Sequence, residues 1–282
     1  MEHVAWSNHP RLRTPVLIAA FEGWNDAGEA ASYAARYLAQ QWGARRFAVI
    51  DPEEFFDFSS TRPTVRLDEG LQRHIEWPST EFVAGAIPGA SVDAVLLVGH
   101  EPQLRWRTFA TEIVDVARDL DVSMVITLGA LLAEVPHSRP VAIIGTAADD
   151  ELIKRLDLRR STYQGPTGIV GVLTDAMRTA GIPIASLWAA VPTYVPGAPS
   201  PKAALALVER VASILEVSVP TTELEIASAS YERQLDELVA GDDDTASYVA
   251  RLEEAADEPD EDDDDGDHAS LIEEVERYLR DQ

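Results

Sequence analysis

Apolar and polar positions along the chain follow two patterns, and each pattern predicts a different element. Continuous apolar runs of strand length are typical of strands buried on both faces of a parallel sheet. The predicted strands are Val16–Phe21, Phe47–Ile50, Ala94–Val98, Met124–Leu128, Val141–Ile144 and Leu187–Val191. The amphipathic segments between them predict helices at Ala27–Gln41, Leu104–Leu120, Asp149–Leu156, Gly168–Ala180 and Lys202–Leu215. This alternation predicts a three-layer α/β/α fold with a largely parallel central sheet.

Local turn and cap signals agree with these elements. Ser200 followed by Pro201 is typical of a helix start, and Gly181 is typical of the residue just after a helix end. Thr64–Leu67 and Gln72–Trp77 alternate in polarity around a short turn. They predict a small hairpin inserted after the second strand.

The C-terminal part of the chain differs from the rest in charge and in pattern. The net charge is −26, and the stretch from Glu223 to Gln282 holds 23 acidic and 4 basic residues, which contribute −19 of it. Such a field repels phosphates, so nucleic acids and anionic membranes are poor partners and a basic protein surface is a better one. The predicted divisions are a core domain at 1–220 with the hairpin at about 64–77, a helical extension at 221–256, an acidic linker at 257–267 and an amphipathic helix at 268–282.

Polar and aromatic residues follow the ends of the predicted parallel strands, where α/β sheets bind ligands. The candidate ligand or interface cluster is Glu22, Trp24, Asn25, His100, Glu101, Arg105, Thr146 and Tyr194. A small-molecule pocket, a polar rim and a subunit contact all remain open interpretations of this cluster.

Two glycine-containing stretches invite comparison with phosphate loops. FEGWNDAG, residues 21–28, lacks the dinucleotide and Walker glycine patterns, so we interpret it as a turn at Gly23 with a helix cap from Asn25 or Asp26. The stretch GPTGIVG, residues 165–171, predicts a helix start that Thr167 caps. Anion binding there and close packing of the helix on the sheet are both open. The candidate glycine loop is Gly165, Thr167, Gly168 and Gly171.

Several chemistries are absent from the sequence. The chain has no cysteine, its six histidines show no His-x-x-x-His spacing, and the acidic run does not fit a calcium loop. The stretch Gly89-Ala90-Ser91-Val92-Asp93 is not a nucleophile elbow, because that motif needs glycine two residues after the serine and this chain has Asp93 there. We therefore expect no metal, no cofactor and no catalytic residues, and favour a protein that is not an enzyme. The sequence also shows no signal peptide and no apolar run of ~18 residues, which favours a cytoplasmic location.

Six segments of the chain resemble a known family. They are PVLIAAFEGWNDAGEAAS, RPTVRLDEGLQRHIEWP, LLVGHEPQLRWRTF, TLGALLAEVPHSRP, YQGPTGIVGVL and SLWAAVPTYVPGAPSPKAAL, and they are similar to the actinobacterial-type branch of the proteasome assembly chaperone family. The resemblance implies a nucleoside-phosphorylase-like fold, a homo-oligomer, and binding to proteasome subunits without catalysis. The chain ends in Leu279-Arg280-Asp281-Gln282, so Asp281 stands where some relatives carry the tyrosine of a proteasome-docking motif.

Three functional hypotheses follow. The first is a non-enzymatic chaperone or adaptor, with Trp24, Trp77, Trp106 and Arg105 as interface anchors. The second is a binding protein or enzyme for a nucleoside-like small molecule, which requires His100, Glu101 or Arg105 to converge on a pocket. The third is a structural oligomer whose acidic tail regulates assembly.

Overall fold

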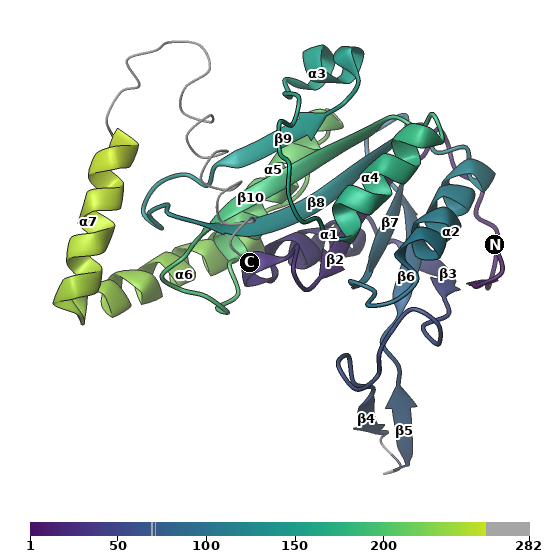
Figure 1. Ribbon diagram of the computed structural model, residues 1–282, viewed down its shortest axis with the longest axis horizontal. Coiled ribbons are helices and arrows are strands. Elements are labelled where there is room, and N and C mark those ends of the chain that lie inside the picture. Colours follow the sequence, from purple (N-terminus) through teal and green to yellow (C-terminus); the bar gives the residue numbers. More distant parts are fainter. Residues whose placement is uncertain (69, 71, 258–282) are drawn as a thin grey trace.

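An eight-stranded sheet forms the centre of the molecule (Figure 1). The computed structural model describes residues 1–68, 70 and 72–257. The strands are β1 (Val4–Trp6), β2 (Val16–Glu22), β3 (Arg45–Ile50), β4 (Thr64–Leu67), β5 (Arg73–Glu76), β6 (Thr80–Ala86), β7 (Asp93–His100), β8 (Met124–Ala133), β9 (Ile143–Ala147) and β10 (Ile184–Pro192). The helices are η1 (Ala27–Glu29), α1 (Ala30–Gln41), α2 (Trp106–Asp119), α3 (Asp150–Leu156), α4 (Ile169–Thr179), α5 (Pro201–Ile214), α6 (Thr222–Ala240) and α7 (Asp243–Asp257).

The sheet is parallel in its middle and antiparallel toward both edges. Its strand order is β1-β3-β6-β7-β2-β8-β10-β9. Strands β7, β2, β8 and β10 run parallel to one another, whereas β6, β3, β1 and β9 add antiparallel pairs. The four parallel strands contain the continuous apolar runs, as expected for strands covered on both faces. Their carboxyl ends therefore meet at one edge of the sheet.

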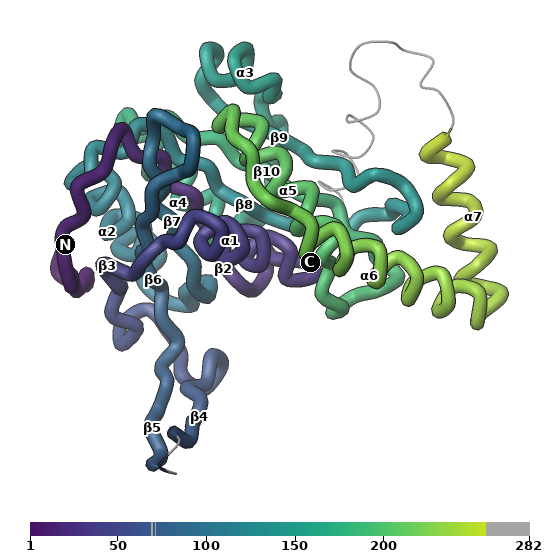
Figure 2. The backbone as a smooth tube through the Cα atoms, turned by 180° about the vertical axis from the view of Figure 1, so that it is seen from behind, coloured from purple at the N-terminus to yellow at the C-terminus, as the bar shows by residue number. Residues whose placement is uncertain are grey.

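Helices cover both faces of the sheet, which confirms the predicted three-layer architecture. Successive residues of β2 point to opposite faces: Val16, Ile18 and Ala20 pack with α1 and α5, and Leu17, Ala19 and Phe21 pack with α2 and α4. Figure 1 shows α2 and α4 in front of the sheet, and the view from behind in Figure 2 shows α1 and α5. All six of these β2 side chains are buried.

The caps predicted at Ser200 and Asp26 form, whereas the cap predicted at Thr167 does not, because Gly168 is the N-cap residue of α4. Ser200 caps α5 by accepting a hydrogen bond from the Ala203 amide at 3.3 Å, and Pro201 is the first helical residue. Asp26 acts from further away, because its Oδ1 atom accepts from the amides of Ala31 and Ser32 at 2.7 and 3.1 Å, across the intervening 3₁₀ turn. Gly23 turns the chain at a φ of 119°, a conformation that favours glycine.

Some elements differ from the sequence prediction. The pattern does not indicate β1 and β6, because three residues are too few for a period and β6 mixes polar, small and apolar residues. The second helix begins at Trp106 rather than Leu104, since Arg105 adopts a left-handed conformation with a φ of 53°. Within the described residues, no helix has the length and apolarity to cross a bilayer.

Two appendages leave the core. The strands β4 and β5 pair as a hairpin that projects away from the large sheet (Figure 1). Helices α6 and α7 follow α5 where the sequence predicts a helical extension, and α6 packs along α5. The domain division at residue 220 stays a prediction, and the remaining acidic linker and the terminal helix at 268–282 lie outside the described residues.

Candidate functional site

Most residues of the predicted cluster lie near the carboxyl edge of the parallel strands, but Thr146 does not, because β9 is antiparallel and pairs Thr146 with Ser186 near the start of β10. The structure divides the cluster among five separate surroundings. Glu22, His100 and Glu101 stand at the paired ends of β2 and β7, where Glu22 lies opposite His100 in register. The other members lie on the turn after β2, at the start of α2, on β9 and after β10. His100, Glu101 and Arg105 do not converge on one point, as the contacts of each show.

His100 and Glu22 form a pair on the wall of an open groove. The Nδ1 atom of His100 lies 2.6 Å from a carboxylate oxygen of Glu22, and the Arg36 guanidinium contacts the other oxygen. Burial lowers the pKa of His100, and the charge of Arg36 lowers it further. Both effects favour the neutral imidazole over the charged one. The groove has a volume of about 470 Å³ and lies between this pair and the hairpin residues Arg62 and Trp77.

Glu101 turns to the start of α4. One of its carboxylate oxygens accepts hydrogen bonds from the Asn25 side-chain amide and the Ile169 backbone amide, both at 2.8 Å. The start of α4 is thus already occupied by a carboxylate of the protein itself, in the position where an external anion would bind. Gly168 makes this arrangement possible, since a Cβ there would lie 2.5 Å from the Asn25 side chain and 2.7 Å from Glu101.

The rest of the glycine loop packs against side chains of its own segment. A Cβ at Gly171 would lie 2.0 Å from the hydroxyl of Thr167, and one at Gly165 would lie 2.4 Å from that of Tyr163. Thr167 does not cap α4, because the N-cap residue is Gly168 and no side chain caps that end from within the loop. Gly165 and Gly171 therefore leave room for side chains of their own loop, which differs from the close packing of the helix on the sheet that the sequence left open.

Arg105 belongs to a third environment. Its guanidinium pairs with Glu54 and lies 6.0 Å from the ring centre of Phe55. Trp106, the next residue, donates its indole N–H to the carbonyl of Pro102 and is partly buried against the α2 side of the core. Both side chains contact residues near the start of α2, and Arg105 is exposed whereas Trp106 is partly buried, so their role as interface anchors stays a prediction.

Trp24 and Thr146 line a separate cavity of about 210 Å³ between the turn after β2, the strands β8, β10 and β9, and the first turns of α4. Trp188 and Leu131 form part of its wall. Trp24 stands at the surface, with 37% of its side chain exposed. Both residues belong to the predicted cluster, but no motif or periodicity in the sequence links them to Trp188.

The hairpin presents an apolar face to solvent. Val65 pairs with Ile75 across the two strands and points to the same face as Leu67, and these three side chains are 49%, 54% and 61% exposed. The opposite face is polar, because Arg66 there forms an ion pair with Glu76 and the His74 ring lies 3.6 Å from the same carboxylate. Trp77 lies at the base of the hairpin with its ring against Phe58.

Comparison with known proteins places the chain in a family. The family model of the PAC2 family matches residues 20–239, which is more than half of the chain. The chain belongs to the PAC2 family. No curated protein matches it.

Solved structures of related proteins agree with this assignment. A PAC2 family protein from Streptomyces avermitilis is 43% identical, covers 83% of this chain and 99% of its own, and superposes with a TM-score of 0.77. A proteasome-assembly chaperone homologue from Mycobacterium tuberculosis is 44% identical with the same coverage and a TM-score of 0.76. A protein of unknown function from Mycobacterium tuberculosis is 30% identical, covers 99% of this chain and 96% of its own, and has a TM-score of 0.85. The resemblance seen in the sequence is confirmed.

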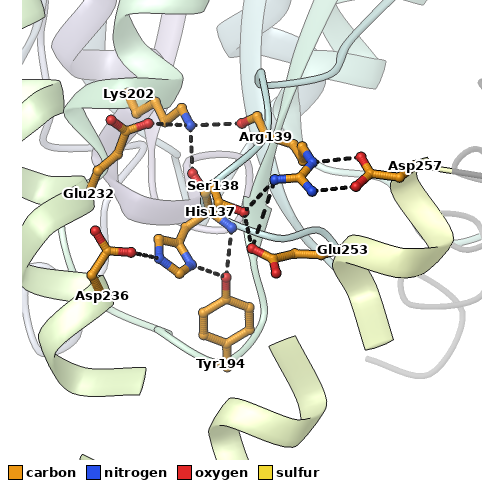
Figure 3. A network of polar contacts seen from close by, with 9 residues as sticks. All are labelled: His137, Ser138, Arg139, Tyr194, Lys202, Glu232, Asp236, Glu253 and Asp257. Carbon is orange, nitrogen blue, oxygen red and sulfur yellow. Dashed lines mark hydrogen bonds and ion pairs between the residues drawn. The ribbon is translucent and has the colours of Figure 1, made fainter. Parts of the chain in front are cut away.

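The PAC2 match ends just before the end of α6, and a polar network joins α6 and α7 to the core (Figure 3). The buried ring of His137 contacts the hydroxyl of Tyr194 at 2.8 Å and Asp236 of α6 at 3.2 Å. Tyr194 also accepts a hydrogen bond from the His137 amide, and burial raises its pKa to about 12. Tyr194 thus belongs to the network that contains His137, whereas His100 belongs to the pair with Glu22.

Lys202 and Arg139 extend the network. The Lys202 ammonium donates to the backbone carbonyls of His137 and Arg139 at 2.5 and 2.7 Å and pairs with Glu232 of α6. Arg139 pairs with Asp257 at the end of α7. Of the network residues, only Tyr194 belongs to the predicted cluster, because no periodicity or motif links residues so far apart along the chain.

Proposed function

We propose that this PAC2 protein is a non-enzymatic, proteasome-assembly-chaperone-like protein that binds other proteins, with proteasome subunits as the partners. The similarity to the proteasome-assembly chaperone homologue from Mycobacterium tuberculosis supports this role. The divergence of His100, Glu101 and Arg105 also favours binding over catalysis, because bond cleavage needs groups that converge on one reacting atom. We further propose that the protein is a cytoplasmic homo-oligomer.

The observation that carries the proposal is the exposed apolar face of the hairpin. A two-stranded hairpin on its own is marginally stable in water, so a second surface against it would add stability. Val65, Leu67 and Ile75 form a compact apolar patch on a polar arm, which is typical of a surface that another protein covers. The arm projects from the body, so a large partner reaches it without a clash with the core (Figure 1).

Charge supports the choice of partner surface. The chain carries a net charge of −26, and the described part of the acidic extension is formed by α6 and α7. Such a field speeds encounter with a basic surface and slows encounter with an acidic one. A proteasome subunit that binds this protein should therefore present basic residues around an apolar centre.

Affinity purification of the tagged protein from the cells that naturally produce it tests the proposal. We expect proteasome subunits to be enriched over an untagged control. The variant Ile75→Asn should reduce their recovery about ten-fold or more, since it places a polar amide at the centre of an apolar contact. The adjacent variant His74→Asn changes the opposite face of the same strand and should retain recovery.

Absence of proteasome subunits from the purified material would contradict the choice of partner. Equal recovery with Ile75→Asn and the original protein would show that the hairpin is not the contact. In both cases circular dichroism should first show that the two variants are folded alike.

A further inference from the structure

The cavity beside Trp24 lies where open α/β sheets bind ligands. The chain leaves β2 toward α1 on one face of the sheet, and the segment after β8 leads through β9 and α3 to α4 on the other face. Divergence of two neighbouring connections opens a crevice at the carboxyl ends of the strands. The cavity of about 210 Å³ extends from this crevice over β10 and β9 as far as Ser186, near the start of β10, and its register partner Thr146.

The sequence builds the walls of the cavity through small residues at defined positions. Trp188 of β10 lies directly against Gly129 of β8, where a Cβ would come within 2.5 Å of the indole ring. Gly171 gives similar room to Thr167. With Trp24 at the mouth and Leu131 and Ile144 beside Trp188, the lining is mostly aromatic and aliphatic.

The cavity has no charge of its own. Among the described residues, no charged side chain lines it, although the protein as a whole carries a net charge of −26. The nearest site for an anion, the start of α4, is occupied by the Glu101 carboxylate. A charged ligand would lose its hydration without gaining a counter-charge, so an uncharged ligand is favoured.

Hydroxyl groups supply a polar side to the cavity. Ser186 is 7% exposed and accepts a hydrogen bond from the Thr127 hydroxyl at 2.8 Å. The Ser186 hydroxyl oxygen lies 3.5 Å from that of Thr174, which is long for a hydrogen bond, and Thr174 donates its proton to the Val170 carbonyl at 2.8 Å. The Ser186 hydroxyl can therefore donate to a carbonyl oxygen of a ligand, and Thr146 lies opposite it in the β9–β10 register.

We propose that this cavity binds a small, uncharged, planar aromatic molecule that carries a hydrogen-bond acceptor. A dry cavity of about 150 Å³ holds one benzene ring, so the volume here admits one ring with a small polar substituent. The ring lies against Trp188 and Trp24, and its acceptor faces Ser186. This inference does not depend on the proposed binding of proteasome subunits.

Benzamide and benzoate form a matched pair of probes, because they share shape and differ in charge. Titration of each into protein labelled with fluorotryptophan, followed by fluorine NMR, reports on the six tryptophans separately. Signals are assigned with Trp24→Phe and Trp188→Phe. We expect saturable shifts of the Trp24 and Trp188 signals with benzamide, a dissociation constant of about 1 mM or tighter, and binding of benzoate at least ten-fold weaker.

Two variants locate the binding. Thr146→Phe fills the cavity from β9 and should abolish the benzamide shifts, whereas Thr64→Phe places the same ring on the exposed hairpin and should leave them unchanged. Ser186→Ala should weaken benzamide several-fold if the carbonyl accepts its proton. Absence of saturable shifts with benzamide, equal binding of benzoate, or unchanged binding in Thr146→Phe would each overturn the proposal.

Discussion

The hairpin and the C-terminal helices both extend from the core, but they differ in how many of their side chains contact it. Every residue of β4 and β5 is exposed, and the ion pairs of the hairpin lie within the hairpin itself. In α6, by contrast, Leu224, Tyr231 and Leu235 are buried, and the polar network of Figure 3 ties both helices to the core. The C-terminal helices are therefore packed against the core, whereas the hairpin leaves its apolar face exposed to solvent.

This difference teaches which appendage is suited to a partner. A face that is already packed and hydrogen-bonded must break contacts before it binds anything, which costs free energy. The exposed face of the hairpin breaks no such contacts. For this reason we assign the proposed protein contact to the hairpin and a structural role to the network, even though α6 and α7 carry more charge.

A pair of leucine variants should give the largest effect. Leu235 is 5% exposed and packs with Val195 and Tyr231, whereas Leu67 is 61% exposed on the hairpin. We expect Leu235→Ala to lower the free energy of unfolding by about 3 kcal/mol, through lost burial and the space left behind. Leu67→Ala should change it by no more than about 0.5 kcal/mol.

Urea unfolding followed by circular dichroism measures both leucine variants. Equal losses would show that the hairpin packs against the body in solution. No loss for Leu235→Ala would show that α6 contributes nothing to the stability of the core.

The strands of the core were predictable because burial on two faces leaves a strong signal. Val16–Phe21 is apolar at every position, and it forms β2 between β7 and β8. The antiparallel strand β6 gave no such signal, since Thr80, Glu81 and Gly85 interrupt its apolar residues. The sequence therefore shows the middle of the sheet more clearly than its edges.

The site was less predictable, because side-chain direction depends on tertiary contacts. His100 and Glu101 are adjacent in sequence, yet one faces Glu22 and the other faces α4. The left-handed conformation of Arg105 has no signature in the residues around it. The parallel strands place Glu22 and His100 at one edge of the sheet as expected, whereas the antiparallel direction of β9, which places Thr146 away from that edge, has no signal in the sequence.

The two lysines of the chain provide the next largest contrast. Lys202 is 14% exposed and serves two backbone carbonyls and Glu232, whereas Lys154 is exposed on α3. Lys202→Met keeps the aliphatic stem but leaves these acceptors without their donor, so we expect a loss of about 2 kcal/mol. Lys154→Met should have little effect.

Hydrogen exchange shows where the Lys202→Met loss falls. Faster exchange in α6 and α7, with the hairpin unchanged, is the expected pattern. A uniform increase over the whole core would mean that the network holds the fold together rather than the appendage alone.

The smallest effect concerns the pH dependence of the network. Burial raises the pKa of Tyr194 to about 12, compared with a pKa of about 10 in an unfolded chain. The folded state therefore binds the phenol proton more tightly than the unfolded state does. Its contribution to stability is fully present below about pH 10 and is lost as the pH rises toward about 12.

Urea unfolding at two pH values tests this. We expect the urea concentration at the unfolding midpoint to fall more between about pH 9.5 and about pH 11.5 in the original protein than in Tyr194→Phe. Tyr33→Phe, which removes an exposed phenol from α1, controls for the loss of one tyrosine. The difference in tyrosinate absorbance between the original protein and Tyr194→Phe gives the titration midpoint of Tyr194, because the chain has seven tyrosines. A midpoint near pH 10 would contradict the burial of the Tyr194 hydroxyl in the network, since it would mean that water reaches it.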